Sequence, residues 1–345
     1  MIRSLSTLAL VTLGAVLLPS CSGGFDPASK IQSVRVLGLK ADKPYAKPGD
    51  TVNLEILAVD RRPKQDREMR VYWVPLVCTN PLNDAYYACF LPGTQLTDPQ
   101  GAPLGAGSGG GGLAPGGGDV TSLLPKGNTF SYVVPSNAVT SHKVVPGSTG
   151  PYGISIVFYL ACAGRVRFAT RDEASANPQQ VPLLCTDEEG NALGADDYVL
   201  GFWRSFSYDD RPNANPVIES VKIGDQVVDA TKPVSVETCT KANAMECEGT
   251  KLTVVVPPSS QEEKPYDPDA PKERVWVSTF SDVVDVDGSQ RLLYDSQKGA
   301  ILDNPVKLTA KGDAVGKSGT VWLVVHDNRS GASWTSLPVT VVPQP

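Results

Sequence analysis

The sequence predicts an all-β protein with two β-sandwich domains, which follow an export segment and a flexible tether. The first observation is alternation with a period of two, as in Val52, Leu54 and Ile56 against Asn53 and Glu55. The second is that such segments recur at short spacing, with turn-forming residues between them. The third is the near absence of long segments with helical periodicity. Short strands without long helices are typical of a sandwich.

The apolar stretch at the N-terminus predicts an export signal. It covers residues 8–18 and is shorter than the ~20 residues that a membrane-spanning helix needs. It leads into Leu18-Pro19-Ser20-Cys21, which resembles the lipobox of bacterial lipoproteins. In that family the cysteine thiol receives diacylglycerol, the preceding peptide is removed, and the new amino group is usually acylated. The resemblance implies a signal peptide at residues 1–20 and a lipidated Cys21.

The same resemblance implies where the mature protein resides. Several acyl chains hold a protein on a bilayer far more firmly than one chain does. In the family's sorting rule Ser22, in place of aspartate, favours the outer membrane. We therefore expect a cell-envelope protein anchored to the outer membrane, with residues 21–30 as lipidated cysteine and flexible tether. The alternative is an ordinary secreted protein cut near Ser20, and the sequence does not decide which membrane face is occupied.

The charge balance excludes one class of partner. The 345-residue chain has 31 basic and 37 acidic residues spread along its length, for a net charge of −6. This balance argues against nucleic-acid binding and provides no polybasic patch for anionic lipid. The predicted contact with the membrane is therefore the lipid anchor. The length and the 41% hydrophobic content are sufficient for two ordinary domains with cores of their own.

Six cysteines remain once Cys21 is set aside. An even number in an exported chain favours disulfides, because the periplasm is oxidising. Six cysteines allow fifteen pairings, and sequence proximity suggests Cys78–Cys89, Cys162–Cys185 and Cys239–Cys247. Each closes a short loop, for which the chain-entropy model gives about 3 kcal/mol. The sequence contains no Cys-x-x-Cys motif, so zinc ribbons and thioredoxin-like redox chemistry lack their usual signature.

The first domain is predicted over residues 31–211. Its strand candidates, in chain order, are 31–39, 52–58, 71–74, 130–134, 154–161 and 199–208. The turn formers Lys47-Pro48-Gly49-Asp50 separate the first two. Between the third and fourth lies a glycine-rich insertion of about residues 91–127. Its glycine repeats at 101–119 cannot offset the entropy cost of a fixed backbone, so we expect a mobile insertion.

A linker is predicted at residues 212–216, where two prolines and several turn formers interrupt the strand pattern. The second domain then spans residues 217–345. Its strand candidates are 217–223, 251–256, 275–280, 306–310, 319–326 and 333–342. In the segment 319–326 both faces are apolar in places, which indicates a central strand.

Parts of both domains resemble immunoglobulin-like modules. A strand, a Pro-Gly-Asp turn and an alternating strand open the first domain like the A and B strands of that fold, and residues 71–74 follow as a C strand with Trp73. No cysteine lies in the B strand, so Trp73 lacks its usual cystine. Residues 321–334 resemble the F strand, turn and G strand of bacterial immunoglobulin-like repeats. The resemblance implies two such sandwiches and transfers no functional residues.

An acidic loop is the best candidate for a metal site. Asp282, Asp285 and Asp287 lie close together, and calcium prefers several carboxylate oxygens. Asp267 and Asp269 could lend oxygens from the preceding loop. The spacing departs from that of an EF-hand, and a solvated acidic turn is the alternative. Apart from calcium at this loop, no cofactor is expected.

A second candidate is a pair of tyrosines in the loop between Cys78 and Cys89. Tyr86 and Tyr87 are adjacent there, and rigid exposed tyrosines suit recognition at a low entropy cost. The alternative is that both tyrosines cover the end of the sandwich.

Catalytic motifs are not evident. The chain has two histidines, His142 and His326, and no Gly-x-Ser-x-Gly elbow. We therefore expect His326, which precedes Asp327, to be a capped or exposed histidine. Residues 312–318 resemble a phosphate-binding loop, but three residues rather than four separate the two glycines. This segment predicts a hairpin turn.

Taken together, these features predict a lipid-anchored cell-envelope protein that acts as a non-enzymatic binding, adhesion or scaffold module. Its expected partners are the membrane, through the lipid, and an envelope protein or polysaccharide. A more specific form of this hypothesis is carbohydrate binding assisted by calcium at the acidic loop. One alternative is a hydrolase that acts on envelope polysaccharide or peptidoglycan. The other is an accessory subunit of a secretion or assembly machine.

Overall fold

The computed structural model describes residues 27–91, 94–104, 116–143, 150–177, 180–241, 246–263 and 272–344. The predicted signal peptide, Cys21 and most of the predicted tether lie outside the described residues, as do Asp267 and Asp269. Within the described ranges, no helix is both long and apolar enough to cross a membrane.

Strands from the first part of the chain form two facing sheets. Their orders are β1-β3-β6 and β2-β10-β7-β4-β5, and the hairpin β8-β9 lies beside them. The strands are β1 Val34–Ala41, β2 Tyr45–Ala46, β3 Thr51–Asp60, β4 Arg70–Thr79, β5 Gln95–Thr97, β6 Thr129–Val133, β7 Gly153–Cys162, β8 Arg165–Phe168, β9 Leu183–Thr186 and β10 Tyr198–Ser207. We call this pair of sheets the first sandwich.

Strands from the rest of the chain form the second sandwich, with sheet orders β12-β11-β14-β19-β16 and β13-β21-β20-β15-β17-β18. The strands are β11 Ser220–Ile223, β12 Gln226–Val227, β13 Val234–Glu237, β14 Thr250–Val255, β15 Val275–Ser281, β16 Asp285–Asp287, β17 Gln290–Asp295, β18 Gly299–Ala300, β19 Val306–Thr309, β20 Ser318–Asp327 and β21 Ala332–Val342. The described helices are short: η1 Leu82–Asp84, η2 Tyr86–Phe90, α1 Ala138–Ser141, α2 Arg171–Ala176, η4 Pro258–Ser260 and η5 Gly312–Ala314.

The two sandwiches share a strand order. In the first, the short strand β2 pairs in parallel with β10, which continues to β7 and β4. In the second, the short strand β13 pairs in parallel with β21, which continues to β20 and β15. The predicted all-β sandwich fold is therefore confirmed. The expected F strand, turn and G strand are β20 and β21, which form an antiparallel pair.

The core of the first sandwich is centred on Trp73, whose side chain is fully buried. Its ring stacks on Phe130 with centroids 5.3 Å apart and meets the edge of Tyr159 at 5.8 Å. Its indole nitrogen donates a hydrogen bond to the carbonyl oxygen of Gly127 at 2.8 Å. Aromatic rings thus surround Trp73 in the core of the first sandwich.

A second apolar cluster covers the outer face of the sheet that contains β4, β7 and β10. Strand β7 is buried at all ten positions, because one face packs in the sandwich core and the other lies under added segments. These segments are η2, residues 120–124 and the hairpin β8-β9, which together we call the cover. Val120 and Leu124 are buried in it. Residues 120–124 of the predicted insertion are therefore packed, while residues 105–115 of its glycine repeats lie outside the described residues.

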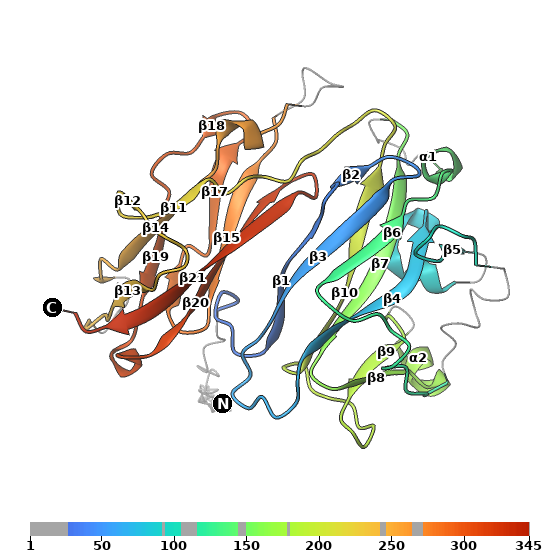
Figure 1. Cartoon of the computed structure of the whole chain (residues 1–345), viewed down its shortest axis with the longest axis horizontal. Coiled ribbons are helices and arrows are strands. Elements are labelled where there is room, and N and C mark those ends of the chain that lie inside the picture. Colours follow the sequence, from blue (N-terminus) through green and yellow to red (C-terminus); the bar gives the residue numbers. More distant parts are fainter. Residues whose placement is uncertain are drawn as a thin grey trace, which may run out of the picture.

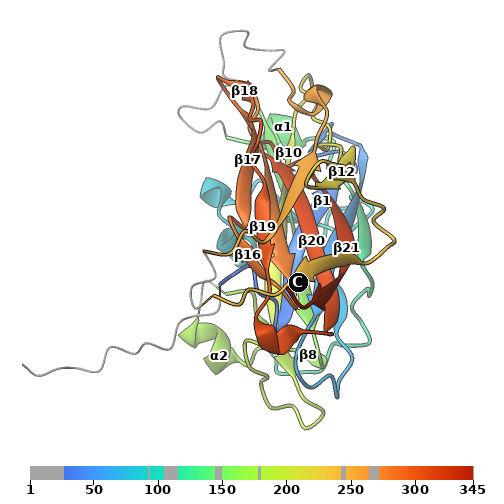
Figure 2. The ribbon, with the colours of Figure 1, turned by 90° about the vertical axis from the view of Figure 1, so that its left-hand side faces the viewer.

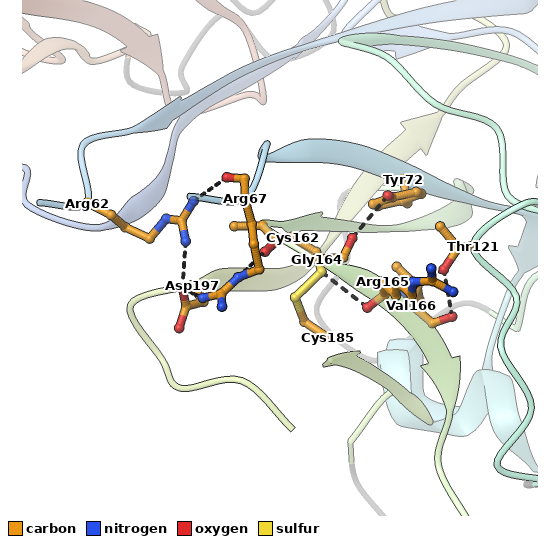
Figure 3. Close-up of a disulfide and its surroundings, with 11 residues drawn as sticks. Arg62, Arg67, Tyr72, Thr121, Cys162, Gly164, Arg165, Val166, Cys185 and Asp197 are labelled. Carbon is orange, nitrogen blue, oxygen red and sulfur yellow. Dashed lines mark hydrogen bonds and ion pairs between the residues drawn. A yellow bond between two sulfur atoms is a disulfide. The ribbon is translucent and has the colours of Figure 1, made fainter. Parts of the chain in front are cut away.

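Two disulfides fasten the cover to the sheet. Cys78 of β4 joins Cys89 of η2, and Cys162 at the end of β7 joins Cys185 of β9 (Figure 3). The third disulfide, Cys239–Cys247, lies between β13 and β14. The three disulfides of the described residues are therefore the three pairings that sequence proximity suggests. They indicate an extracytoplasmic protein, since such bonds persist in oxidising compartments.

The two sandwiches pack against each other, so that four sheets lie side by side across Figure 1. In Figure 2 the second sandwich lies in front of the first. The contact joins the outer face of β1 and β3 to that of β20, β15 and β21. Its apolar cluster consists of Ile31, Leu37, Trp322 and Val324, with Leu57, Val59, Phe280 and Trp334 packed against it. At Gly38 a Cβ atom would lie only 3.2 Å from Trp334 and Val324, so glycine permits this close approach.

The linker between the sandwiches is bonded to both. Asn215 donates its side-chain amide to the carbonyl oxygen of Ala41 at 2.7 Å and accepts the backbone N–H of Ala332 at 2.9 Å. Asn213 is buried and donates to the carbonyl oxygen of Arg329 at 3.0 Å. These bonds, together with the apolar contact, fix the relative orientation of the two sandwiches.

Candidate binding site

A groove of about 370 Å³ lies on the outer face of the second sandwich. Its lining residues come from three places along the chain. They are Arg274 just before β15 and Trp276 in β15, Gln290, Arg291 and Leu292 of β17, and Asn328 after β20. Its size falls within the ~300–1,000 Å³ that is usual for small-ligand sites. The first sandwich covers one end of this outer face, at Trp322 and Phe280, and the groove lies toward the other end.

An aromatic pair forms one side of the groove. Trp276 lies directly across from His326 in the β15–β20 ladder, and the two rings stack with centroids 5.4 Å apart. Burial lowers the pKa of His326 to about 4, so this ring is neutral near pH 7. His326 is therefore not the exposed histidine that was one of the two expectations, since its ring is half-buried against the indole. Because β15 lies between β20 and β17, the other face of Trp276 is on the groove side.

The groove lining contains two arginines and no acidic residue. The side chain of Arg291 is held in place by two contacts. Its Nε donates a hydrogen bond to the carbonyl oxygen of Pro305 at 3.1 Å, and its guanidinium lies against Gly288, where a Cβ atom would clash. Arg274 is exposed, and within the described ranges no salt bridge joins it to a carboxylate. Asn328 accepts the backbone N–H of Arg274 at 3.0 Å, which holds the two together at the rim.

Behind the groove lies a buried group of charged side chains that we call the ionic cluster: Glu262, Glu273, Asp327 and Arg329. Glu273 is 1% exposed, Asp327 and Arg329 are each 4% exposed. Arg329 lies 3.5 Å from a carboxylate oxygen of Glu273 and 3.8 Å from one of Glu262. One oxygen of Asp327 accepts the backbone N–H groups of Arg329 and Gly331, both at 2.7 Å. The cluster therefore fixes the β20–β21 turn that carries Asn328.

Three carboxyl groups face one guanidinium in this cluster. Burial, and next the charge of Asp327, raises the pKa of Glu273 to about 8. Burial also raises the pKa values of Asp327 and Glu262. Protonation of Glu273 near neutral pH reduces the excess of negative charge in the cluster. The cluster is therefore a structural support of the groove. Its carboxyl groups do not line the groove, and those of Glu273 and Asp327 are buried.

Glu273 predicts a specific pH dependence of stability. Its pKa is about 8 when folded and near 4.5 in ordinary surroundings, so the folded chain holds a proton that the unfolded chain releases between these values. The stability that this bound proton contributes is therefore fully present below a pH of about 4.5, and it is lost as the pH rises through about 8. In Glu273→Gln this part of the pH dependence is expected to vanish, as measured by urea midpoints from about pH 5 to about pH 9.

His326 contributes the opposite trend, since a lowered pKa costs stability as the pH falls. His326 is present in both the parent and Glu273→Gln. The difference between their urea midpoints therefore reports the contribution of Glu273 alone. A difference that stays constant across this pH range would contradict the assignment.

A second cavity, of about 410 Å³, lies beside the Cys162–Cys185 disulfide at the end of the first sandwich (Figure 3). It is lined by three arginines and three acidic residues, with Tyr72, Thr121 and Gly164. Its arginines are already paired: Arg67 with Asp197 at 3.0 Å, Arg165 with Asp119 at 3.4 Å, and Arg70 with Glu68. This cavity is internally neutralised, which makes it the weaker candidate for a charged ligand.

The predicted calcium site is not supported. Asp282 pairs with Arg61 at 2.7 Å, Asp285 with Lys30 at 3.7 Å and Asp287 with Lys307 at 3.6 Å. In the described part of the chain, no three His, Cys, Asp or Glu side chains gather as a metal site. The fold brings a cation to each aspartate, which sequence spacing does not reveal. Asp282 and Asp285 instead help to join the two sandwiches.

The two predicted tyrosines differ in their surroundings. Tyr86 stacks on Phe202 with ring centroids 4.6 Å apart and belongs to the cover. Tyr87 is 39% exposed. Both residues are in η2, but only Tyr87 is available to a partner. The residues of the groove were missed in the sequence, although the alternation in 273–280 already places Arg274 and Trp276 on one face.

Comparisons with known proteins assign no family. No family model and no curated protein matches the chain. Among solved structures, dimeric latent PorU from Porphyromonas gingivalis is similar over 92% of this chain and 24% of its own, with 11% identity and a TM-score of 0.20. The three N-terminal domains of the outer capsid protein Hoc from bacteriophage RB49 are similar over 91% of this chain and 100% of their own, with 10% identity and a TM-score of 0.17. Both similarities are distant.

Proposed function

We propose that this chain is an exported, lipid-anchored cell-envelope protein that acts as a non-enzymatic binding module, with the groove as its binding site. The observation that carries the proposal is the groove itself, in which exposed Arg274 lies beside Trp276 on a rigid, supported sheet. Its lining offers no carboxylate, thiol, hydroxyl or imidazole, the groups that act as nucleophile or general base. Such a lining suits binding better than catalysis.

The proposed address rests on two independent features. The lipobox at Leu18-Pro19-Ser20-Cys21 supports lipidation of Cys21, and Ser22 favours the outer membrane. The three disulfides agree with folding outside the cytosol. A lipid tether at the N-terminus would hold the stacked sandwiches near the membrane and present the groove to a polysaccharide or protein of the envelope.

The hydrolase alternative needs two carboxyl groups that converge in an accessible pocket, roughly 5–9.5 Å apart. In the ionic cluster behind the groove, the carboxyl groups of Glu273 and Asp327 are buried at 1% and 4% exposure. This burial favours the binding module. The accessory-subunit alternative makes a separate expectation, namely a stable protein complex that survives detergent extraction.

The proposed lipid anchor and membrane location can be tested with the variant Cys21→Ser. The parent chain is expected in the membrane fraction, with a mature N-terminus at Cys21 that carries acyl groups in mass spectrometry. The variant is expected to keep its signal peptide, because processing in this class of protein follows lipidation, and to carry no acyl groups. Ser22→Ala is the matched control and should be lipidated and processed like the parent. A Cys21→Ser protein that is processed and fractionated like the parent would overturn the proposal.

A further inference from the structure

We propose that the groove binds a saccharide chain that bears carboxylate groups. This inference rests on the proposed function and deepens it by naming the ligand class. The two elements of the groove that carry it are the groove-side face of Trp276 and the guanidinium of Arg274.

The charge of the lining favours an acidic ligand. Arg274 is exposed, and within the described residues no salt bridge ties it to a carboxylate, although its charge helps to lower the pKa of nearby Asp295. The second cavity, by contrast, pairs each of its arginines directly with an acidic side chain. A planar guanidinium donates two parallel hydrogen bonds to a carboxylate. The groove lining therefore holds two arginines and no acidic side chain, on a chain whose net charge is −6.

The shape and chemistry of the lining favour a sugar. His326 stacks on one face of the Trp276 indole, and half-buried Trp276 lines the groove beside Leu292, its cross-strand partner on β17. The C–H face of a pyranose ring is apolar and fits such a surface, while its hydroxyl groups project from the ring edge. Gln290 and Asn328 place carboxamides at the same groove, where they can hydrogen-bond these hydroxyl groups.

The position of the groove disfavours a peptide. Strand β15 is paired on both sides, with β20 and β17, so no free edge is present there for an added strand. The apolar lining consists of Trp276 and Leu292, which is too little for the apolar face of a bound helix. We therefore expect an acidic peptide to bind less tightly than an acidic sugar, and the experiment includes one for comparison.

The experiment uses the full chain, extracted from membranes in detergent, and titration calorimetry with three acidic oligosaccharides: oligogalacturonate, oligomannuronate and oligoglucuronate. Each is paired with its methyl ester, which has the same sugar chain without the charge. A short polyglutamate serves as the acidic peptide. The parent is expected to bind at least one acidic oligosaccharide about tenfold or more tightly than its ester, and more tightly than polyglutamate.

Two variants separate the contributions of ring and charge. Trp276→Ala is expected to lose about tenfold or more in affinity for acid and ester alike, while Trp276→Phe retains part of the binding. Arg274→Gln is expected to abolish the preference for the acid over the ester and to leave the ester unchanged. Arg165→Gln, in the second cavity, is the matched control and should bind like the parent. Urea titrations in which each variant is still fully folded in the binding buffer exclude loss of fold as the cause.

Three results would overturn the inference: no binding of any acidic oligosaccharide, equal binding of acid and ester, or polyglutamate binding as tightly as the sugars. A lipidated, correctly located chain with any of these results leaves the proposed address intact. An unlipidated chain that still prefers the acidic sugar would overturn the address and leave this inference standing.

Discussion

Replacing Arg329 with methionine is expected to lower the free energy of unfolding by about 3–5 kcal/mol, because it leaves buried carboxyl groups without their cation. Arg329 is 4% exposed and lies 3.5 Å from Glu273 and 3.8 Å from Glu262. Its backbone N–H also bonds to Asp327, so disorder of the side chain would reach the β20–β21 turn. Urea titration, followed by circular dichroism, measures the loss.

Two further proteins make this result interpretable. Arg165→Met removes an exposed pair with Asp119 and is expected to cost at most about 1 kcal/mol. Arg329→Met combined with Glu273→Gln removes one of the stranded carboxyl groups and should recover part of the loss above about pH 8, where Glu273 is ionised. If Arg329→Met is no more harmful than Arg165→Met, the ionic cluster does not support the turn.

Trp73→Ala is expected to destabilise the first sandwich by about 3–5 kcal/mol. The side chain is fully buried, stacks on Phe130, contacts the edge of Tyr159 and donates a hydrogen bond to Gly127. Truncation removes these contacts and leaves a cavity, since a close-packed core relaxes only in part. Hydrogen exchange followed by mass spectrometry should show the loss of protection in β3, β4 and β6.

The matched control is Trp276→Ala, which truncates the same side chain on the outer face of the second sandwich. Trp276 is only partly buried, so a smaller loss is expected, with no change of protection in the first sandwich. Equal losses for the two variants would contradict the assignment of Trp73 as the centre of the core.

The sheets of both sandwiches were predictable, and the reasons are local. Val52, Leu54 and Ile56 are buried in β3 and alternate with exposed or half-buried neighbours, as the period of two requires. The three disulfides join cysteines that are near in the chain, at separations of 8, 11 and 23 residues. Short loops favour such pairing because little chain entropy is lost on closure.

The site could not be predicted in the same way. The aspartates at 282, 285 and 287 have the spacing of a metal loop, yet Arg61, Lys30 and Lys307 reach them from other parts of the chain. Likewise, Trp276 and His326 are fifty residues apart and meet through strand register, as the ladder pairs 276 with 326. Partners of a charged or aromatic side chain are set by the packing of distant segments.

By itself, the sequence determined the all-β class, the longer strands of both sandwiches, the disulfide pairs and a predicted lipid address, but it missed shorter strands such as β8, β9 and β17. All of these depend on neighbours in the chain, whose spacing is written in the sequence. Only the tertiary structure decided that the sandwiches stack through Gly38 and Trp334, that the cover closes one sheet face and that Trp276 and Arg274 share a groove. The physical reason is that apolar burial and ion pairing are satisfied by whichever side chains the folded chain brings within contact distance.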